Sequence, residues 1–344
     1  MKHAELTTSR QNKKKEFFFV LLSTFRNFAP KDATRDNAKC HTWQDEMRHV
    51  ATRDATRGKN KNHMKKLFFL LAALWAMTAS AEKRCPLEGY RMVWHDEFRG
   101  KELNLKKWTY QEARAGWVNN ELQTYVAGRT PEGRPTVEVS DGTLKIHAIK
   151  EGDKIYSGRI YGHRQEGFLY GYFEARIKLP VGRGTWPAFW MMPVKHRNGW
   201  PADGEIDIME EVGANPNYVS SSIHCTAYNH PQKTQKTHES LCETAESDFH
   251  LYALEWTNRY IRTYVDGQEQ LYFENDGKWD NDTWPFSWEF YPILNLAWGG
   301  NWGGYRGIDW DALPVTMEVD YVRVWQKYKS LHALPSLKHG TVGL

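Results

Sequence analysis

Short runs of β-branched and aromatic residues, separated by Gly, Pro and Asp, dominate the chain and limit it to a β-fold. Examples are "YRMVWHDEF", "TVEVSDGTLKIHAI", "GYFEARIKL" and "MEVDYVRVWQ". Such runs predict strands, and long helical periodicity is absent. The Asp-Gly pairs at 141–142 and 266–267 predict hairpins with type I′ turns. We therefore predict an all-β fold built from two stacked antiparallel sheets.

The first 81 residues differ from the rest. Residues 64–81 have two lysines, an apolar run and Ala-Ser-Ala, the pattern of a secretory signal peptide. A buried core helix is the alternative. The apolar run is short for a membrane span, and we expect no span after signal cleavage. We interpret residues 1–63 as an upstream extension outside the folded protein, 82–328 as one folded domain, and 329–344 as a C-terminal tail.

The charge divides at the same place. Residues 1–81 contain 16 Lys and Arg against 7 Asp and Glu, whereas the remainder contains 30 against 35. A basic face is the usual footprint of nucleic-acid binding, so we expect no nucleic-acid partner. We expect a monomer.

Three cysteines follow residue 81. Export to an oxidising compartment would allow a disulfide between Cys225 and Cys242, with Cys85 left over. No Cys/His spacing resembles a zinc site.

The segment "GEIDIMEEVG" (204–213) places four carboxylates among isoleucine, methionine and valine. In a strand, alternate side chains share a face, so Glu205 and Asp207 lie together while the isoleucines enter the core. Regular continuation would bury Glu210, and a buried charge is costly unless it is paired. A one-residue bulge at 208–209 would return Glu210 to the face of the other two acids, and bulges are frequent beside active sites.

Three carboxylates on one face repel each other, which raises at least one pKa and keeps one carboxyl protonated near neutral pH. Hydrolysis of a glycosidic bond needs such a pair, one carboxyl ionised and one protonated. Two other interpretations stay open: a strand solvated on one side, or a calcium site, although Ca²⁺ usually takes loop oxygens.

The tryptophans fall into groups, and 14 of the 16 follow residue 81. Trp256 and Trp325 alternate with polar residues in strand patterns, which predicts burial in the core. Trp186 and Trp302 lie beside Gly or Pro, where an exposed indole can stack on the apolar face of a sugar ring; core burial is the alternative. Trp190 fits either location.

"GEIDIMEEVG" resembles the active-site strand of glycoside hydrolase family 16, in the laminarinase-like branch whose pattern E-x-D-x-x-E carries the extra methionine. "VWHDEF", "NNELQTY", "SGRI", "GTWPAFWMMP", "LNLAWGGNWGG" and "MEVDYVRVWQ" also resemble family segments, over nearly all of 82–328. The resemblance implies a β-jelly-roll sandwich with a concave substrate cleft. It also implies endo-acting hydrolysis of β-glucans or galactans with retention of configuration.

Roles follow from the same resemblance. Glu205 is the expected nucleophile, Glu210 the acid/base and Asp207 a residue that tunes the nucleophile; Glu211 has no expected role. With Trp302 from the tryptophan pattern, the expected substrate-binding residues are Asn120, Arg159, Trp186, Trp190, His224 and Trp302.

No cofactor is expected for catalysis. The resemblance implies one structural calcium ion, held by the backbone carbonyls of Glu97 and Gly142 and by the side chain of Asp320. Trp298 stands where a small aliphatic residue is common, and we expect it to add a stacking surface or close a subsite.

We therefore expect an exported bacterial enzyme, secreted, periplasmic or on the cell surface. It would be a retaining endo-β-glucanase that acts on β-1,3 or mixed-linkage β-1,3/1,4-glucans. Two alternatives are a hydrolase of agar- or carrageenan-type galactans and a carbohydrate-binding jelly roll without activity. A structural or adhesion protein is a third.

Overall fold

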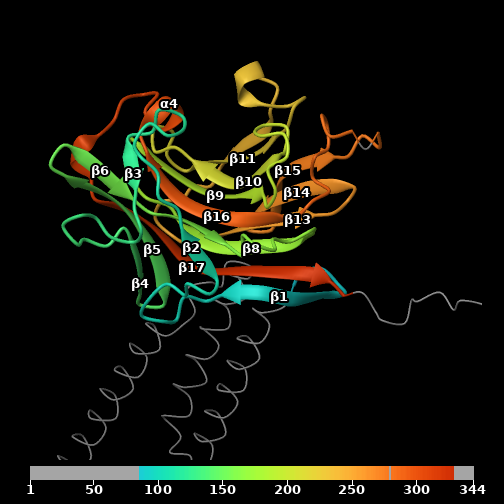
Figure 1. Ribbon diagram of the computed structural model, residues 1–344, viewed down its shortest axis with the longest axis horizontal. Coiled ribbons are helices and arrows are strands. Elements are labelled where there is room, and N and C mark those ends of the chain that lie inside the picture. The colour runs from blue at the N-terminus through green and yellow to red at the C-terminus, as the bar shows by residue number, and fades with distance from the viewer. Residues whose placement is uncertain (1–84, 279, 329–344) are drawn as a thin grey trace, which may run out of the picture. The chain divides into compact units, whose positions relative to one another are not determined.

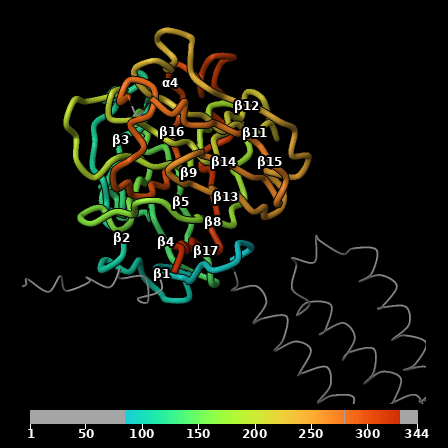
Figure 2. The backbone as a smooth tube through the Cα atoms, turned by 90° about the vertical axis from the view of Figure 1, so that its right-hand side faces the viewer, coloured from blue at the N-terminus to red at the C-terminus, as the bar shows by residue number. Residues whose placement is uncertain are grey.

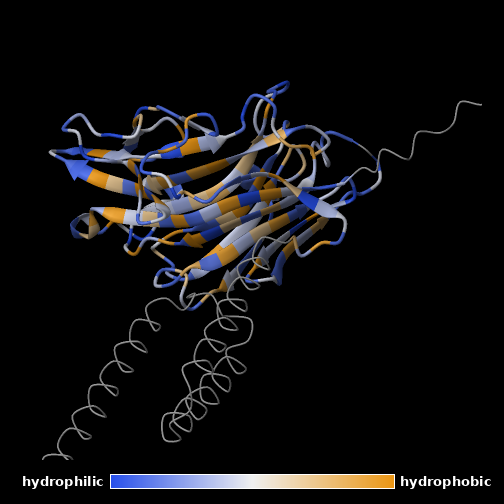
Figure 3. Cartoon of the chain, turned by 90° about the horizontal axis from the view of Figure 1, so that it is seen from below, coloured by the Kyte–Doolittle hydropathy of each residue, from blue (hydrophilic) through white to orange (hydrophobic). Residues whose placement is uncertain are grey.

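Alternating apolar and polar residues build two stacked β-sheets in the computed structural model, which describes residues 85–278 and 280–328 (Figure 1 and Figure 2). Figure 3 shows hydrophobic and hydrophilic residues alternating along the strands. The predicted extension (1–63), signal peptide (64–81) and tail (329–344) lie outside the described residues. The all-β sandwich of two antiparallel sheets is confirmed.

The larger sheet has ten strands in the order β15-β14-β13-β8-β17-β5-β6-β3, with β1 also paired to β17 and β4 to β5. All of its pairs are antiparallel except β3 with β6. Its strands are β1 (Tyr90–Asp96), β3 (Gln123–Tyr125), β4 (Val137–Ser140), β5 (Thr143–Glu151), β6 (Lys154–Ser157), β8 (Gly171–Lys178), β13 (His250–Trp256), β14 (Tyr260–Val265), β15 (Gln268–Glu274) and β17 (Val315–Lys327).

The second sheet has seven antiparallel strands in the order β12-β11-β10-β9-β16-β7-β2. They are β2 (Trp108–Tyr110), β7 (Arg159–Gly162), β9 (Thr185–Pro193), β10 (Glu205–Glu211), β11 (Tyr218–His224), β12 (Lys236–Leu241) and β16 (Phe290–Trp298). Helical turns are confined to η2 (His230–Gln232), α4 (Gly300–Gly303) and η3 (Trp310–Ala312) in the described part. We call the side of this sheet turned away from the larger sheet the open face.

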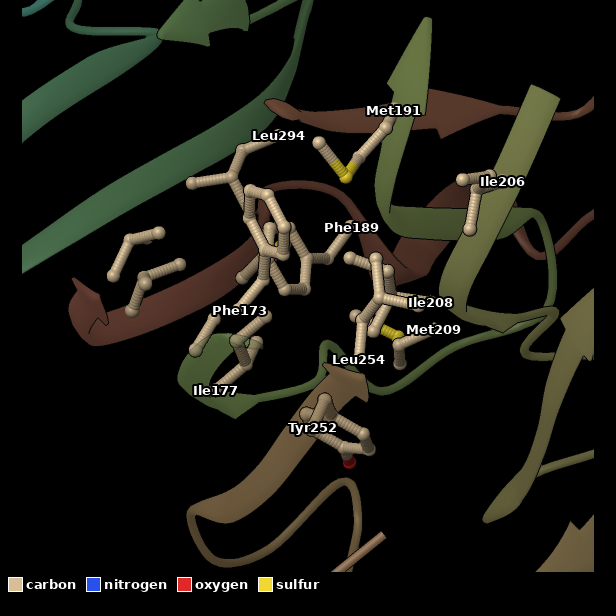
Figure 4. Packing of buried hydrophobic residues seen from close by; sticks show 14 of the residues in the cluster. Phe173, Ile177, Phe189, Met191, Ile206, Ile208, Met209, Tyr252, Leu254 and Leu294 are labelled. Carbon is tan, nitrogen blue, oxygen red and sulfur yellow. The ribbon is translucent and has the colours of Figure 1, made fainter. Parts of the chain in front are cut away.

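The core lies between the two sheets. Figure 4 shows Phe189, Met191 and Leu294 from the seven-stranded sheet beside Phe173 and Leu254 from the larger one. Full burial of a large apolar side chain contributes about 1.5–3 kcal/mol, so these contacts hold the sheets together. Trp256 and Trp325 are buried, as the strand pattern predicts.

Both predicted hairpin turns are confirmed. Ser140 pairs with Thr143 around residues 141–142, and Val265 pairs with Gln268 around residues 266–267. All four turn residues have positive φ, between 48° and 80°. A type I′ turn requires this conformation at both central residues, which Asp-Gly tolerates.

The disulfide between Cys225 and Cys242 that the sequence left open is not formed, because both thiols are free. The register of β11 and β12 gives the reason: Tyr218 pairs with Leu241 and Ile223 with Lys236. Cys225 and Cys242 therefore follow opposite ends of one hairpin, too far apart for the short Cα separation that a disulfide needs.

No helix within 85–278 and 280–328 is both long enough and apolar enough to span a membrane.

Glu211, the last residue of β10, is fully buried and away from the open face. One oxygen accepts the backbone N–H of Asn217 at 2.7 Å, and the other has no partner. Burial, with a smaller effect from the charge of Glu246, raises the pKa of Glu211 to about 8. The carboxyl therefore favours its neutral form in the folded state.

We predict that Glu211→Gln stabilises the protein relative to wild type as pH rises from 6 to 9. A raised carboxyl pKa gives stability that is present below the unfolded-state pKa and lost as pH passes the folded-state value. The whole rise from 4.5 to about 8 corresponds to about 5 kcal/mol, of which about 3 kcal/mol is lost between pH 6 and the folded-state pKa. Melting temperatures at pH 6 and 9 measure the effect. Exposed Glu243→Gln is the control, and a difference between Glu211→Gln and wild type that does not change with pH contradicts the prediction.

Candidate active site

A β-bulge in β10 places three carboxyl groups on the open face. Asp207 pairs with Ser222 of β11 and Glu210 with Ser220, so two residues of β10 lie opposite Ser221 alone. Those two residues, 208–209, are fully buried in the core with Ile206, as Figure 4 shows. The hydroxyl of Ser221 donates to the carbonyl of the first at 2.7 Å. The predicted bulge is confirmed.

Glu205 begins β10 and is held by an indole from the preceding loop. The Nε1–H of Trp200 donates to Oε2 of Glu205 at 2.6 Å. Burial, followed by the charge of Asp207, raises the pKa of Glu205 to about 8, and the two side chains share a hydrogen bond.

Asp207 lies between the two glutamates and is only 2% exposed. Its Oδ2 is 3.2 Å from Nε2 of His224, the residue that ends β11 and pairs with Glu205 across the strands. Burial and the charge of Glu210 raise the pKa of Asp207 well above its usual range. Asp207 therefore holds a proton readily in this site.

Glu210 follows the bulge and meets the first tryptophan of β9. Nε1–H of Trp186 donates to Oε1 of Glu210 at 2.9 Å. Burial raises the pKa of Glu210 to about 7; the Trp186 hydrogen bond opposes this rise and the charge of Glu205 adds to it. A carboxyl with this pKa can both give and take a proton near neutral pH.

The predicted tryptophans border these acids, and all three are half-buried. Trp186 and Trp302 meet edge to face, with ring centroids 5.3 Å apart. Trp190 lies four residues from Trp186 on the same face of β9, and its Nε1–H donates to Oδ1 of Asn295 at 2.7 Å. Its partial exposure and polar partner place it on the open face rather than in the core.

Arg159 and Asn120 lie toward the α4 end of the open face. The guanidinium of Arg159 is 4.7 Å from the ring centroid of Trp190, and its Nε donates to Gln111 at 2.8 Å. Asn120 donates to Asn301 in α4 at 2.8 Å. The loop 111–122 thus meets α4, which Figure 1 labels above the sheets.

Several residues of this site were not among the predicted site residues. Trp200 contacts Glu205 directly, and its ring lies 5.1 Å from that of His230. Trp117 is 44% exposed, with the guanidinium of Arg159 over its ring. Trp200 lies between Gly and Pro and Trp117 follows Gly116, so the context shared with the predicted tryptophans could have identified both.

Two further residues were missed because only the folded chain brings them together. Glu121 is buried, accepts hydrogen bonds from Asn119 and Gln123, and has a pKa raised by burial. Asn295 joins Trp190 to the hydroxyl of Tyr125.

The expected role of Trp298 is wrong. Its side chain is 0% exposed and belongs to the core, below Gly184. A buried indole offers no stacking surface to a sugar. Nine successive residues of β16, which ends at Trp298, are buried, so the strand has no exposed position at this end.

The proposed calcium ligands come from neighbouring segments. β1 pairs with the 322–327 part of β17 and β5 with the 315–319 part, so Glu97 and Gly142 both lie near Asp320. The carboxylate of Asp320 is 2.9 Å from Nη1 of Arg176, a cation that would compete with a metal ion. The strand register brings the three expected ligands together, but the ion pair between Asp320 and Arg176 occupies one of them. The calcium site stays a prediction.

The open-face cluster of Glu205, Asp207 and His224 has ligand atoms within 4.8 Å of one another. Trp200 already donates to Glu205, and His224 contacts Asp207. The arrangement therefore suits proton transfer and nucleophilic attack better than metal binding.

Known proteins resemble the chain in sequence and fold. The model of "Glycosyl hydrolases family 16" matches residues 130–323. The beta-glucanase of Rhodothermus marinus is 40% identical over 280 residues, which cover 78% of this chain and 96% of that protein.

Solved structures agree with this match. SCLam, a non-specific endo-β-1,3(4)-glucanase, is 44% identical with a TM-score of 0.66, over 71% of this chain and 94% of its own. The laminarinase from Rhodothermus marinus is 40% identical with a TM-score of 0.66, over 70% of this chain and 98% of its own. By its sequence and by its fold, the chain belongs to glycoside hydrolase family 16.

Proposed function

We propose that the chain is a retaining endo-β-glucanase that hydrolyses β-1,3 or mixed-linkage β-1,3/1,4-glucans by double displacement. The bulge in β10 carries this proposal, because it gathers three carboxyl groups with raised pKa on one face bordered by half-buried tryptophans. The family and the similarity to a beta-glucanase and an endo-β-1,3(4)-glucanase support the substrate class.

The first step needs an ionised nucleophile and a protonated acid. Asp207 is the most deeply buried of the three and its pKa is raised well above the usual range, so Asp207 keeps the proton that the two side chains share while Glu205 is ionised. The carboxylate of Glu205 attacks the anomeric carbon, while Glu210 gives its proton to the leaving glycosidic oxygen. A glycosyl ester on Glu205 results.

The second step reverses the proton transfer. Glu210, now ionised, takes a proton from a water molecule that attacks the anomeric carbon and releases the ester. Two inversions give net retention. The Trp186 hydrogen bond stabilises Glu210 while it is ionised, and Trp200 does the same for Glu205.

The remaining open-face residues would hold the polymer. Trp186 and Trp302 offer faces for sugar rings, and Trp190 with Arg159 forms a combined aromatic and cationic surface. Asn120 extends this surface at the α4 end. His224 contacts Asp207 and would keep it oriented.

We also propose that the enzyme acts outside the cytoplasm, on the grounds of the signal-peptide pattern at 64–81 and the polymeric substrate. The 82–328 domain boundaries and the monomeric state stay predictions.

The substrate class is tested on laminarin, mixed-linkage glucan, agarose and carrageenan. We expect oligosaccharides of intermediate length from laminarin or mixed-linkage glucan, because an open face admits the middle of a polymer. Chromatography of early products measures this. Release from agarose or carrageenan alone supports the galactanase alternative, and binding without any product supports a non-catalytic module.

We predict that Glu205→Gln and Glu210→Gln each lower kcat by at least about 10³-fold while glucan binding is kept, because removal of a nucleophile or a general acid costs on this scale. Glu211→Gln, also on β10 but facing the core, is the matched control and should keep its activity. NMR of the first product should show the β-anomer. Near wild-type turnover by Glu205→Gln rules out the proposed nucleophile.

We predict that Trp186→Phe moves the alkaline limb of kcat/KM, expected near pH 7 from the pKa of Glu210, upward by about one pH unit. The indole N–H stabilises ionised Glu210, so its loss raises the pKa, and Glu210 keeps its proton at higher pH. Trp302→Phe, whose ring contacts Trp186, is the control. A limb at the same pH in Trp186→Phe and wild type contradicts the assignment of Glu210.

A further inference from the structure

A thiol, an imidazole and a carboxylate meet away from the proposed catalytic residues. Cys242 follows β12, His250 begins β13, and Asp266 lies in the turn between β14 and β15. One ligand atom from each lies within 4.8 Å of the other two. Cys242 follows the end of β12 that pairs with Tyr218, opposite the end of β11 that carries His224. The proposed hydrolysis uses none of the three.

The carboxylate fixes the orientation of the imidazole. Nδ1 of His250 is 2.6 Å from Oδ2 of Asp266, while Oδ1 accepts the backbone N–H of Leu251 at 2.8 Å. The other ring nitrogen, Nε2, is 2.9 Å from the hydroxyl of Thr244. Since Asp266 is anchored by the backbone, the ring presents Nε2 toward the segment that carries Cys242.

The electrostatics match this geometry. Burial alone would lower the pKa of His250, but hydrogen bonds with Asp266 and Cys242 raise it to about 10. The imidazole is therefore cationic at neutral pH, and it lies beside the sulfur of Cys242. Nucleophilic cysteines use this arrangement of nucleophile, base and orienting group.

The other cysteines in the described part have no such surroundings. Cys225 is fully buried, with its sulfur 3.7 Å from a backbone carbonyl, and burial raises its pKa. Burial also raises the pKa of Cys85 to about 11, with a smaller contribution from Glu174. Cys242 is half-buried, so it combines access with a cationic neighbour.

We propose that Cys242 is a reactive thiol and a site of thiol–disulfide exchange with low-molecular-weight disulfides, held ready by His250 and Asp266. The Cys242 thiolate attacks one sulfur of the disulfide, a new S–S bond forms on Cys242, and the other sulfur leaves as a thiolate. The His250 imidazolium protonates this leaving thiolate. The products are one mixed disulfide and one free thiol, so no other oxidant is required.

The test uses oxidised glutathione and the full chain with Cys40, which lies outside the described residues, replaced by Ser. Samples are quenched in acid at intervals, and peptide mass spectrometry gives the rate at each cysteine. We expect Cys242 to react at least about 10-fold faster than Cys85 and Cys225 in the same molecules, because Cys242 is half-buried and lies beside an imidazole that a carboxylate holds in place. Equal rates, or a faster Cys85, overturn the proposal without any variant.

The Asp266→Asn variant tests whether the His250–Asp266 pair, rather than the exposure of Cys242 alone, makes this thiol reactive. The amide oxygen can still accept the Leu251 N–H, but the imidazolium loses its counter-ion. The rate at Cys242 should fall by about 10-fold while that at Cys85 is unchanged. An unchanged Cys242 rate contradicts the role of the His250–Asp266 pair. The same reaction is also measured after treatment of the protein with EDTA. A faster reaction at Cys242 after this treatment would identify the cluster as a metal site and overturn the proposal.

Discussion

The two residues of β10 that face one residue of β11 are the constraint on which the site depends. Ile208 and Met209 both enter the core, which the alternation of a regular strand forbids for neighbours. Because both apolar side chains are buried there, the strand must bulge, and Glu210 turns to the open face. The hydrophobic effect that closes the core thus also places Glu210, the proposed acid/base, on the same face as Glu205, the proposed nucleophile.

On the other face of β10, burial raises the pKa values of the carboxyl groups. Three carboxyl groups lie close together among tryptophan rings, and their pKa values rise because ionised forms lose hydration. The indole N–H groups of Trp186 and Trp200 limit this rise at the two glutamates, whereas Asp207 has a histidine neighbour. The result is one site that holds both a proton and a negative charge, as double displacement requires.

Features with local causes could be predicted from the sequence. The Asp-Gly turns follow from φ preferences, and the bulge follows from acids and apolar residues placed out of phase along β10. Features that depend on partners far along the chain could not. Cys225 and Cys242 are separated by the register of a hairpin, and Trp298 is buried in the core at the end of β16, an interior strand between β9 and β7. Trp200 reaches Glu205 only through the fold of the loop before β10.

The most direct test of the account is to trap the glycosyl-enzyme. In a 2-deoxy-2-fluoro β-glucoside oligosaccharide, the fluorine slows both the formation and the hydrolysis of the glycosyl-enzyme. A good leaving group speeds formation alone, so the intermediate accumulates. Peptide mass spectrometry then locates the added sugar. The account predicts a single ester on Glu205, formed at wild-type rate in Glu211→Gln and absent in Glu205→Gln. An ester on Asp207 or Glu210, or turnover with inversion and no covalent species, would contradict it.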